Sequence, residues 1–148
     1  MRIAAIVGAG LAMLSTLAVA QNSTNATAML QPKAPQGAKV FFVAPKDGAT
    51  VGRDVHVEFG VTGIKLEPAT NVSSNSGHHH LLIDVGTLPA MNAPIPSDAH
   101  HLHFGKGQTE TTIRLSPGEH TLQLDFGNYA HMQFDPPIVS KKITIHVK

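Results

Sequence analysis

The chain has 148 residues, with 11 Lys or Arg, 10 Asp or Glu and 10 His, and its formal net charge is +1. A chain this close to neutrality lacks the dense positive charge that nucleic-acid binding needs, so we expect no nucleic-acid partner. Because the sequence contains no cysteine, disulfides do not stabilise the fold and thiolates do not bind a metal.

Residues 1–20 have the pattern of a secretory signal peptide. Arg2 supplies a positive charge, residues 3–19 are apolar and uncharged, and an A-x-A site ends at Ala20. We therefore expect cleavage after Ala20 and a mature protein that begins at Gln21. An uncleaved membrane anchor is the less favoured alternative, because the apolar run is marginal for spanning ~30 Å of hydrocarbon.

The compartment follows from the same features. Since no other apolar run is long enough to cross a membrane, we expect no membrane insertion after signal cleavage. Eukaryotic secreted domains of this size commonly contain disulfides, so an exported chain without cysteine favours the bacterial periplasm.

The segment 21–38, QNSTNATAMLQPKAPQGA, is rich in Ser, Thr, Asn, Ala and Pro and predicts a disordered linker. Residues 39–148 instead contain short apolar or alternating runs separated by Gly and Pro, which indicates one all-β domain. The expected strands cover 39–45, 53–61, 78–86, 109–115, 120–126 and 140–148.

This spacing of strands and turns is typical of a single immunoglobulin-like antiparallel β-sandwich of about seven strands. Side chains at alternate positions of a strand share a face, so each sheet should have one buried face. The apolar alternations predicted to form the core are 55, 57 and 59, then 81, 83 and 85, and finally 122, 124 and 126.

Two histidine clusters stand out in the strand pattern, GHHHLLIDV and HHLHFGKG. On a strand, His78 and His80 point to one face and His79 points to the other. His101 and His103 have the same i, i+2 relation in the second cluster. Two such units can converge on one ion if their strands are neighbours, because adjacent strands lie ~4.8 Å apart.

Neutral imidazole is a preferred ligand of Cu(II), zinc and nickel. His131 lies in the connection before the last expected strand and adds a third group. We therefore predict a copper site, with zinc as the alternative, formed by His78, His80, His101, His103 and His131. Asp84 and Asp135 are the candidates to accept hydrogen bonds from the second ring nitrogens. The isolated residues His56, His120 and His146 are predicted to be solvated.

The alternative function is a non-catalytic structural or protein-interaction module. In that case the histidines would hydrogen bond and fix the proline-bearing loop 86–99 to the sheet. An enzyme is disfavoured, because no G-x-S-x-G elbow is present and the carboxylates at 84, 110, 125 and 135 are spread over different segments, as solvated or turn-capping residues are. The expected partners are a metal ion and another periplasmic protein.

Several ordered blocks of the sequence carry a family resemblance: GHHHLLID, the LP and IP dipeptides of the next loop, HLHFGKGQTET, LSPGEHTLQL and DPPIVSKKITI. Together they span about Val40 to Val147 and resemble a bacterial family known as domain of unknown function 4399. The resemblance implies no activity. Members usually have Gly-Asp and a His-rich stretch where this chain has GNYAH, which leaves His131 as the candidate ligand there.

A looser similarity is to the small β-sandwich carriers of periplasmic copper resistance. In those carriers a Pro-Gly turn leads into the penultimate strand and a loop with a histidine ligand precedes the last strand, as SPGEHTLQL leads to His131 here. They also place a ligand at the mature N-terminus, where this chain would have Gln21. The similarity implies a copper cargo.

The signal-peptide prediction is checked by mass spectrometry of the exported protein. The intact mass should correspond to a chain that begins at Gln21, because the small residues before it form the cleavage site. An intact Met1 in the soluble exported fraction would contradict this expectation.

Overall fold

A computed structural model describes residues 31–148. The expected signal peptide and residues 21–30 of the expected linker lie outside the described residues. Within the described part of the chain, no helix is long and apolar enough to span a membrane. The described residues form nine strands: β1 Lys39–Ala44, β2 Thr50–Val51, β3 Asp54–Thr62, β4 Lys65–Leu66, β5 Ser76–Ile83, β6 His101–His103, β7 Glu110–Arg114, β8 Gly118–Gly127 and β9 Ile143–Val147.

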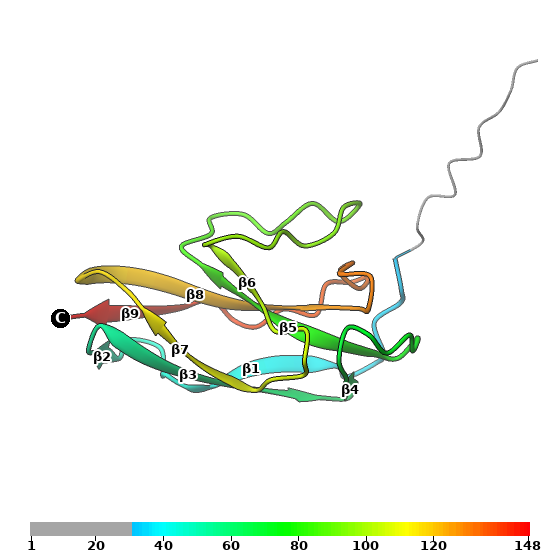
Figure 1. The fold of residues 1–148 in the computed structure, drawn as a ribbon, viewed down its shortest axis with the longest axis horizontal. Helices are drawn as coiled ribbons and strands as arrows, with labels where there is room; N and C mark the ends of the chain where they lie inside the picture. The colour runs from blue at the N-terminus through cyan, green and yellow to red at the C-terminus, as the bar shows by residue number, and fades with distance from the viewer. Residues whose placement is uncertain (1–30) are drawn as a thin grey trace, which may run out of the picture.

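These strands form two layers, which Figure 1 shows one above the other. One sheet has the order β1-β3-β7, and the larger sheet has the order β2-β9-β8-β5-β4, with β6 also paired to β5. The all-β sandwich predicted from the sequence is therefore confirmed. The long strands pair antiparallel, whereas the two-residue strands β2 and β4 pair parallel with β9 and β5. β2 is far from β9 in the chain, whereas β4 is joined to β5 by residues 67–75.

The space between the sheets is filled by alternate residues of the long strands, as their hydrophobic pattern predicts. The members that are at most 1% exposed include Val55, Val57, Phe59, Leu81, Leu122, Leu124 and Phe126. Ile83 is also buried, but Val85 lies beyond the end of β5 and is half-buried. The predicted inward face is thus correct within the strands.

The ordered domain begins before Lys39, where the sequence predicts that the linker ends. Backbone N–H of Ala34 donates to Asp135 O at 3.0 Å, and that of Asp135 donates to Pro32 O at 2.9 Å. The side chain of Gln31 donates to Met91 O. The prediction of a disordered linker is therefore corrected for residues 31–38, because their backbone groups find partners on the domain.

Strand β5 is the most enclosed element of the molecule, since all eight of its residues are buried. It lies between β8 on one side and β4 and β6 on the other. The loop between β5 and β6 lies over the face of β5 and β8 that points away from the smaller sheet (Figure 1). Both faces of β5 are therefore shielded from water.

Leu124 is 0% exposed between the sheets, so its truncation should destabilise the fold. Leu124→Ala should lower the free energy of unfolding by about 2 to 5 kcal/mol, because the change leaves a cavity. Urea denaturation of this variant measures the loss. The matched control is Val72→Ala at a residue that is 72% exposed, which should change stability by less than about 0.5 kcal/mol. Equal effects of the two substitutions would contradict the assigned core.

Candidate metal centre

The three consecutive histidines of β5 are divided between the two faces of the sheet. His79 points into the core, where its ring centroid lies 4.7 Å from that of Phe59 and 5.1 Å from that of Phe126. His78 and His80 point to the opposite face, as strand alternation requires. All three side chains are 0% exposed.

Strand β6 brings His103, the last histidine of the second cluster, to this face. His103 pairs directly with His80 across the two strands, and directly opposed side chains share a face. The ring centroid of His103 lies 5.2 Å from that of His80 and 4.8 Å from that of His78. His78 and His80 are buried, and His103 forms the exposed side of the cluster.

Two glycines leave room for these rings. A Cβ atom built on Gly127 would lie 3.0 Å from Cε1 of His80, which is tighter than ordinary contact. A Cβ atom on Gly105 would collide with the ring of His103. Glycine at the end of β8 and in the turn after β6 therefore leaves space for the imidazoles, and the need for it is strongest at Gly105.

His131 reaches the cluster from the turn after β8. The side-chain oxygen of Asn128 accepts two backbone N–H groups of this turn, each at 2.9 Å. His131 itself has a φ of 61°. Its ring centroid lies 4.7 Å from that of His103 and 5.0 Å from that of His78.

The ring nitrogens converge at a spacing that suits a shared ion. Nε2 of His103 is 3.1 Å from Nε2 of His78 and 3.1 Å from Nε2 of His131. One nitrogen from each of His78, His80 and His103 lies within 4.8 Å of the other two. Metal–nitrogen bonds of about 2.0–2.1 Å place neighbouring ligand nitrogens about 3–3.4 Å apart. The cluster could therefore hold a metal ion.

Several polar atoms beside this cluster are buried without a hydrogen-bond partner in the described part of the chain. They include both ring nitrogens of His80, Nδ1 of His78 and both carboxylate oxygens of Asp125. Native proteins pair nearly all of their buried polar groups, because an unpaired one is costly. Both ring nitrogens of His79 in the core are also without a partner, so an unpaired nitrogen alone does not indicate a ligand. What distinguishes His78 and His80 is that their rings lie beside two further imidazoles.

Burial also fixes the protonation of the cluster. Desolvation, reinforced by the neighbouring imidazoles, lowers the pKa of His78 to about 4 and that of His80 to about 2. Both rings are therefore neutral at pH 7, which is the form that binds a metal. Desolvation raises the pKa of the Asp125 carboxyl to about 7.

The structure thus brings together His78, His80, His103 and His131 from the predicted ligands, but it places His101 elsewhere. His101 is paired with Leu82, two residues further along β5 than His80. Its Nδ1 lies 2.9 Å from Oδ1 of Asp98. The i, i+2 relation does put both histidines of β6 on one face, but the strand register leaves His101 outside the cluster.

The two carboxylates predicted to support the ligands also lie elsewhere. Asp84 has a φ of 57° where β5 ends, and its Oδ2 is 2.7 Å from Nδ1 of His120. Asp135 forms an exposed ion pair with Lys33 at 2.7 Å. The prediction that His120 is solvated is also corrected, since its side chain is only 13% exposed and the hydrogen bond with Asp84 raises its pKa.

Sequence reasoning missed Asp125, which is directly opposite His80 on β8 and is 0% exposed. The sequence does contain one signal, since Asp125 alternates with the core residues Leu124 and Phe126 and so belongs to the outer face. Only the register between β5 and β8 shows that this position adjoins a histidine.

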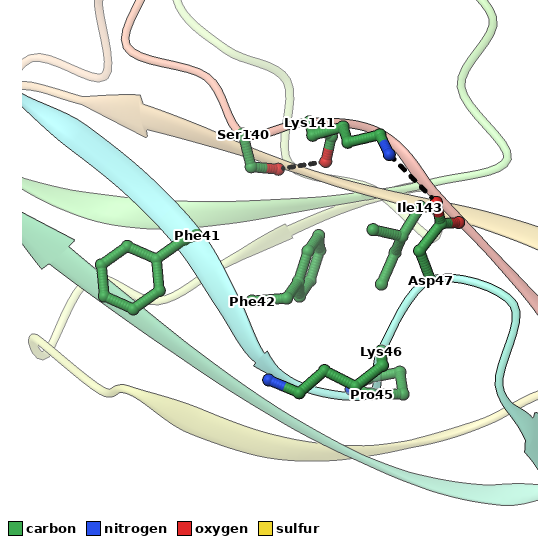
Figure 2. A pocket seen from close by; sticks show the side chains of 8 residues that line it. All are labelled: Phe41, Phe42, Pro45, Lys46, Asp47, Ser140, Lys141 and Ile143. Atoms are coloured by element: carbon green, nitrogen blue, oxygen red, sulfur yellow. Dashed lines mark hydrogen bonds and ion pairs between the residues drawn. The ribbon is translucent and has the colours of Figure 1, made fainter.

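Pockets elsewhere on the described surface offer no comparable set of free nitrogens. Figure 2 shows one of about 190 Å³ at the end of β1, lined largely by apolar side chains such as Phe42 and Ile143. Of its charged residues, Lys141 and Asp47 pair with each other at 3.2 Å, and the third is Lys46. A larger pocket of about 550 Å³ lies beside His120, both of whose ring nitrogens have partners.

The fold and the site define a small β-sandwich protein with a candidate histidine metal centre. The family described as Domain of unknown function (DUF4399) matches residues 57–148, and the chain belongs to this family. The matched region includes the four converging histidines and Asp125. Neither a curated protein nor a solved structure gives a significant match to the chain.

The buried imidazoles predict how the stability of the metal-free protein depends on pH. Burial lowers the pKa values of His78, His79 and His80 to about 4, 4 and 2, below the unfolded value of 6.5. Their stability contribution is therefore complete above pH 6.5 and is lost as the pH falls. Asp125 acts in the opposite direction, because a raised carboxyl pKa costs stability as the pH rises from 3.8 to about 7.

His103 also has a lowered pKa, and His120 has a raised one. Since four groups oppose two, we expect the metal-free protein to lose stability on acidification from about pH 6.5 to pH 5. Each group contributes at most about 1.4 kcal/mol per pH unit. Urea denaturation at several pH values in the presence of a chelator measures this slope. A midpoint that is constant or rises on acidification would show that the three rings of β5 are protonated in the folded protein.

Proposed function

We propose that this chain is an exported, periplasmic protein that binds a metal ion without catalysing a reaction. The ligands are His78, His80, His103 and His131, and the preferred ion is copper, with zinc as the alternative. The observation that carries this proposal is the pair of unpartnered, fully buried ring nitrogens of His80 beside three other imidazoles.

The competing function is an interaction module whose histidines hold the loop 86–99 against the sheet. That loop is held by other groups: backbone N–H of Ile95 donates to His131 O at 2.8 Å, and the side chain of Gln133 donates to Pro89 O at 3.1 Å. His80 takes no part in these contacts. A network residue would have hydrogen-bond partners, so this observation favours the metal-binding function.

The choice of ion rests on ligand chemistry. The donors are imidazole nitrogens, and the sequence contains no cysteine. Imidazole sites bind Cu(II) more tightly than zinc according to the usual order of divalent affinities. Export by the predicted signal peptide would place the site in an oxidising compartment, which also favours Cu(II). Because His103 is exposed, an ion can reach the buried ligands from that side.

Calorimetric titration of the metal-free protein with Cu(II) and Zn(II) tests the proposal. His80→Ala and His103→Ala should each weaken binding at least about tenfold, because each removes a converging ligand. His146→Ala is the matched control, since His146 is an exposed histidine of β9 that lies 3.9 Å from Glu119 and outside the cluster. It should leave the affinity unchanged.

Circular dichroism of each variant checks that the sandwich is retained. If the wild-type protein takes up neither ion above background, the interaction-module function replaces this one. The same conclusion follows if the three histidine variants bind alike.

A further inference from the structure

A second group of buried polar atoms extends the outer face beyond the four histidines. Asp125 of β8 pairs with His80 of β5 on one side and bridges to Val139 on the other. Gln133 bridges to Gly127 on the same side of β8 and is 0% exposed. Opposed side chains share a face, so Asp125 and Gln133 lie on the same face as His80.

The fold gives no reason for a carboxylate at position 125. Within the described residues, neither oxygen of Asp125 nor Oε1 of Gln133 has a hydrogen-bond partner of ordinary geometry. The backbone N–H of Phe126 acts on the carboxyl of Asp125, but its effect is smaller than that of desolvation. The side-chain nitrogen of Gln133 donates to Pro89 O at 3.1 Å. A buried carboxylate without a partner is costly, whereas one that faces a cation is compensated.

Resting on the proposed function, we infer that Asp125 is the charge-balancing carboxylate of the metal centre and that it makes the site selective for a divalent ion over the cuprous ion. Neutral imidazoles carry no negative charge. A divalent ion bound by them alone would leave two uncompensated positive charges at a site whose inner side, formed by His78 and His80, is shielded from water.

The geometry explains the selectivity. Asp125 is opposite His80 across the strands. The two side chains are not in direct hydrogen-bond contact, so the carboxylate would act on the second ring nitrogen of His80 through a bridging water molecule. Its attraction to the bound ion scales with the charge of that ion. Both kinds of ion would be bound by the same imidazoles. Removing the carboxylate should therefore lower the affinity for a divalent ion more than the affinity for a monovalent one. Asp125 acts here as a positioning and charge-balancing residue.

The test compares Asp125→Asn with the wild-type protein in competition titrations with Cu(II), with Zn(II) and, under reducing conditions, with Cu(I). We expect the affinities for Cu(II) and Zn(II) to fall about 10- to 100-fold and the affinity for Cu(I) to fall much less. Asp84→Asn is the matched control, since its carboxylate contacts His120 outside the cluster. It should leave all three affinities unchanged.

The possible outcomes separate this inference from the proposed function. If the wild-type protein binds no ion, the proposed function fails, and this inference fails with it. In a second outcome, the wild-type protein binds a metal while Asp125→Asn leaves all three affinities unchanged or lowers them by the same factor. In that case only the role of Asp125 is overturned. Asp125→Ser provides a second variant without the charge. If neither variant folds, the carboxylate belongs to the fold and the inference is wrong.

Discussion

The structure depends on burying three adjacent imidazoles, His78 to His80, in the centre of the larger sheet. A strand cannot send adjacent side chains to the same face, so the rings need two different environments. The core supplies the first, where the rings of Phe59 and Phe126 pack against His79 in T-shaped pairs. The outer face must supply the second, and it contains further imidazoles, two glycines that leave space, and a covering loop. Much of the irregular chain after β5 and β8 surrounds these two outward rings.

The long strands could be predicted from the sequence because their apolar residues alternate over five or more positions. The alternation places the core faces of β3 and β8 correctly. Strands β2, β4 and β6 have two or three residues each, and runs this short contain no period to detect. The start of the domain was also hidden, since the contacts of residues 31–38 use backbone groups, which leave no trace in the side-chain pattern.

Only part of the candidate site could be predicted from local sequence patterns. Convergence of His78 and His80 follows from the spacing within one strand, and this part was predictable. The register between neighbouring strands decides the rest. It places His103 in the cluster, leaves His101 outside it, and puts Asp125 opposite His80. That register is a property of the whole sheet and cannot be read from local spacing. Asp84 was misplaced for a related reason, because its positive φ ends the strand and turns the carboxylate towards His120.

The four histidines come from elements of unequal local stability. His78 and His80 belong to the central strand, which has neighbours on both sides. His103 comes from a three-residue edge strand, and His131 comes from a turn. Edge segments and turns open in small fluctuations that leave the core intact. Amide hydrogens of β5 should therefore exchange with solvent far more slowly than those of β6. A captured ion would have a residence time governed by the brief detachment of two outer ligands, so release would not require unfolding of the sandwich.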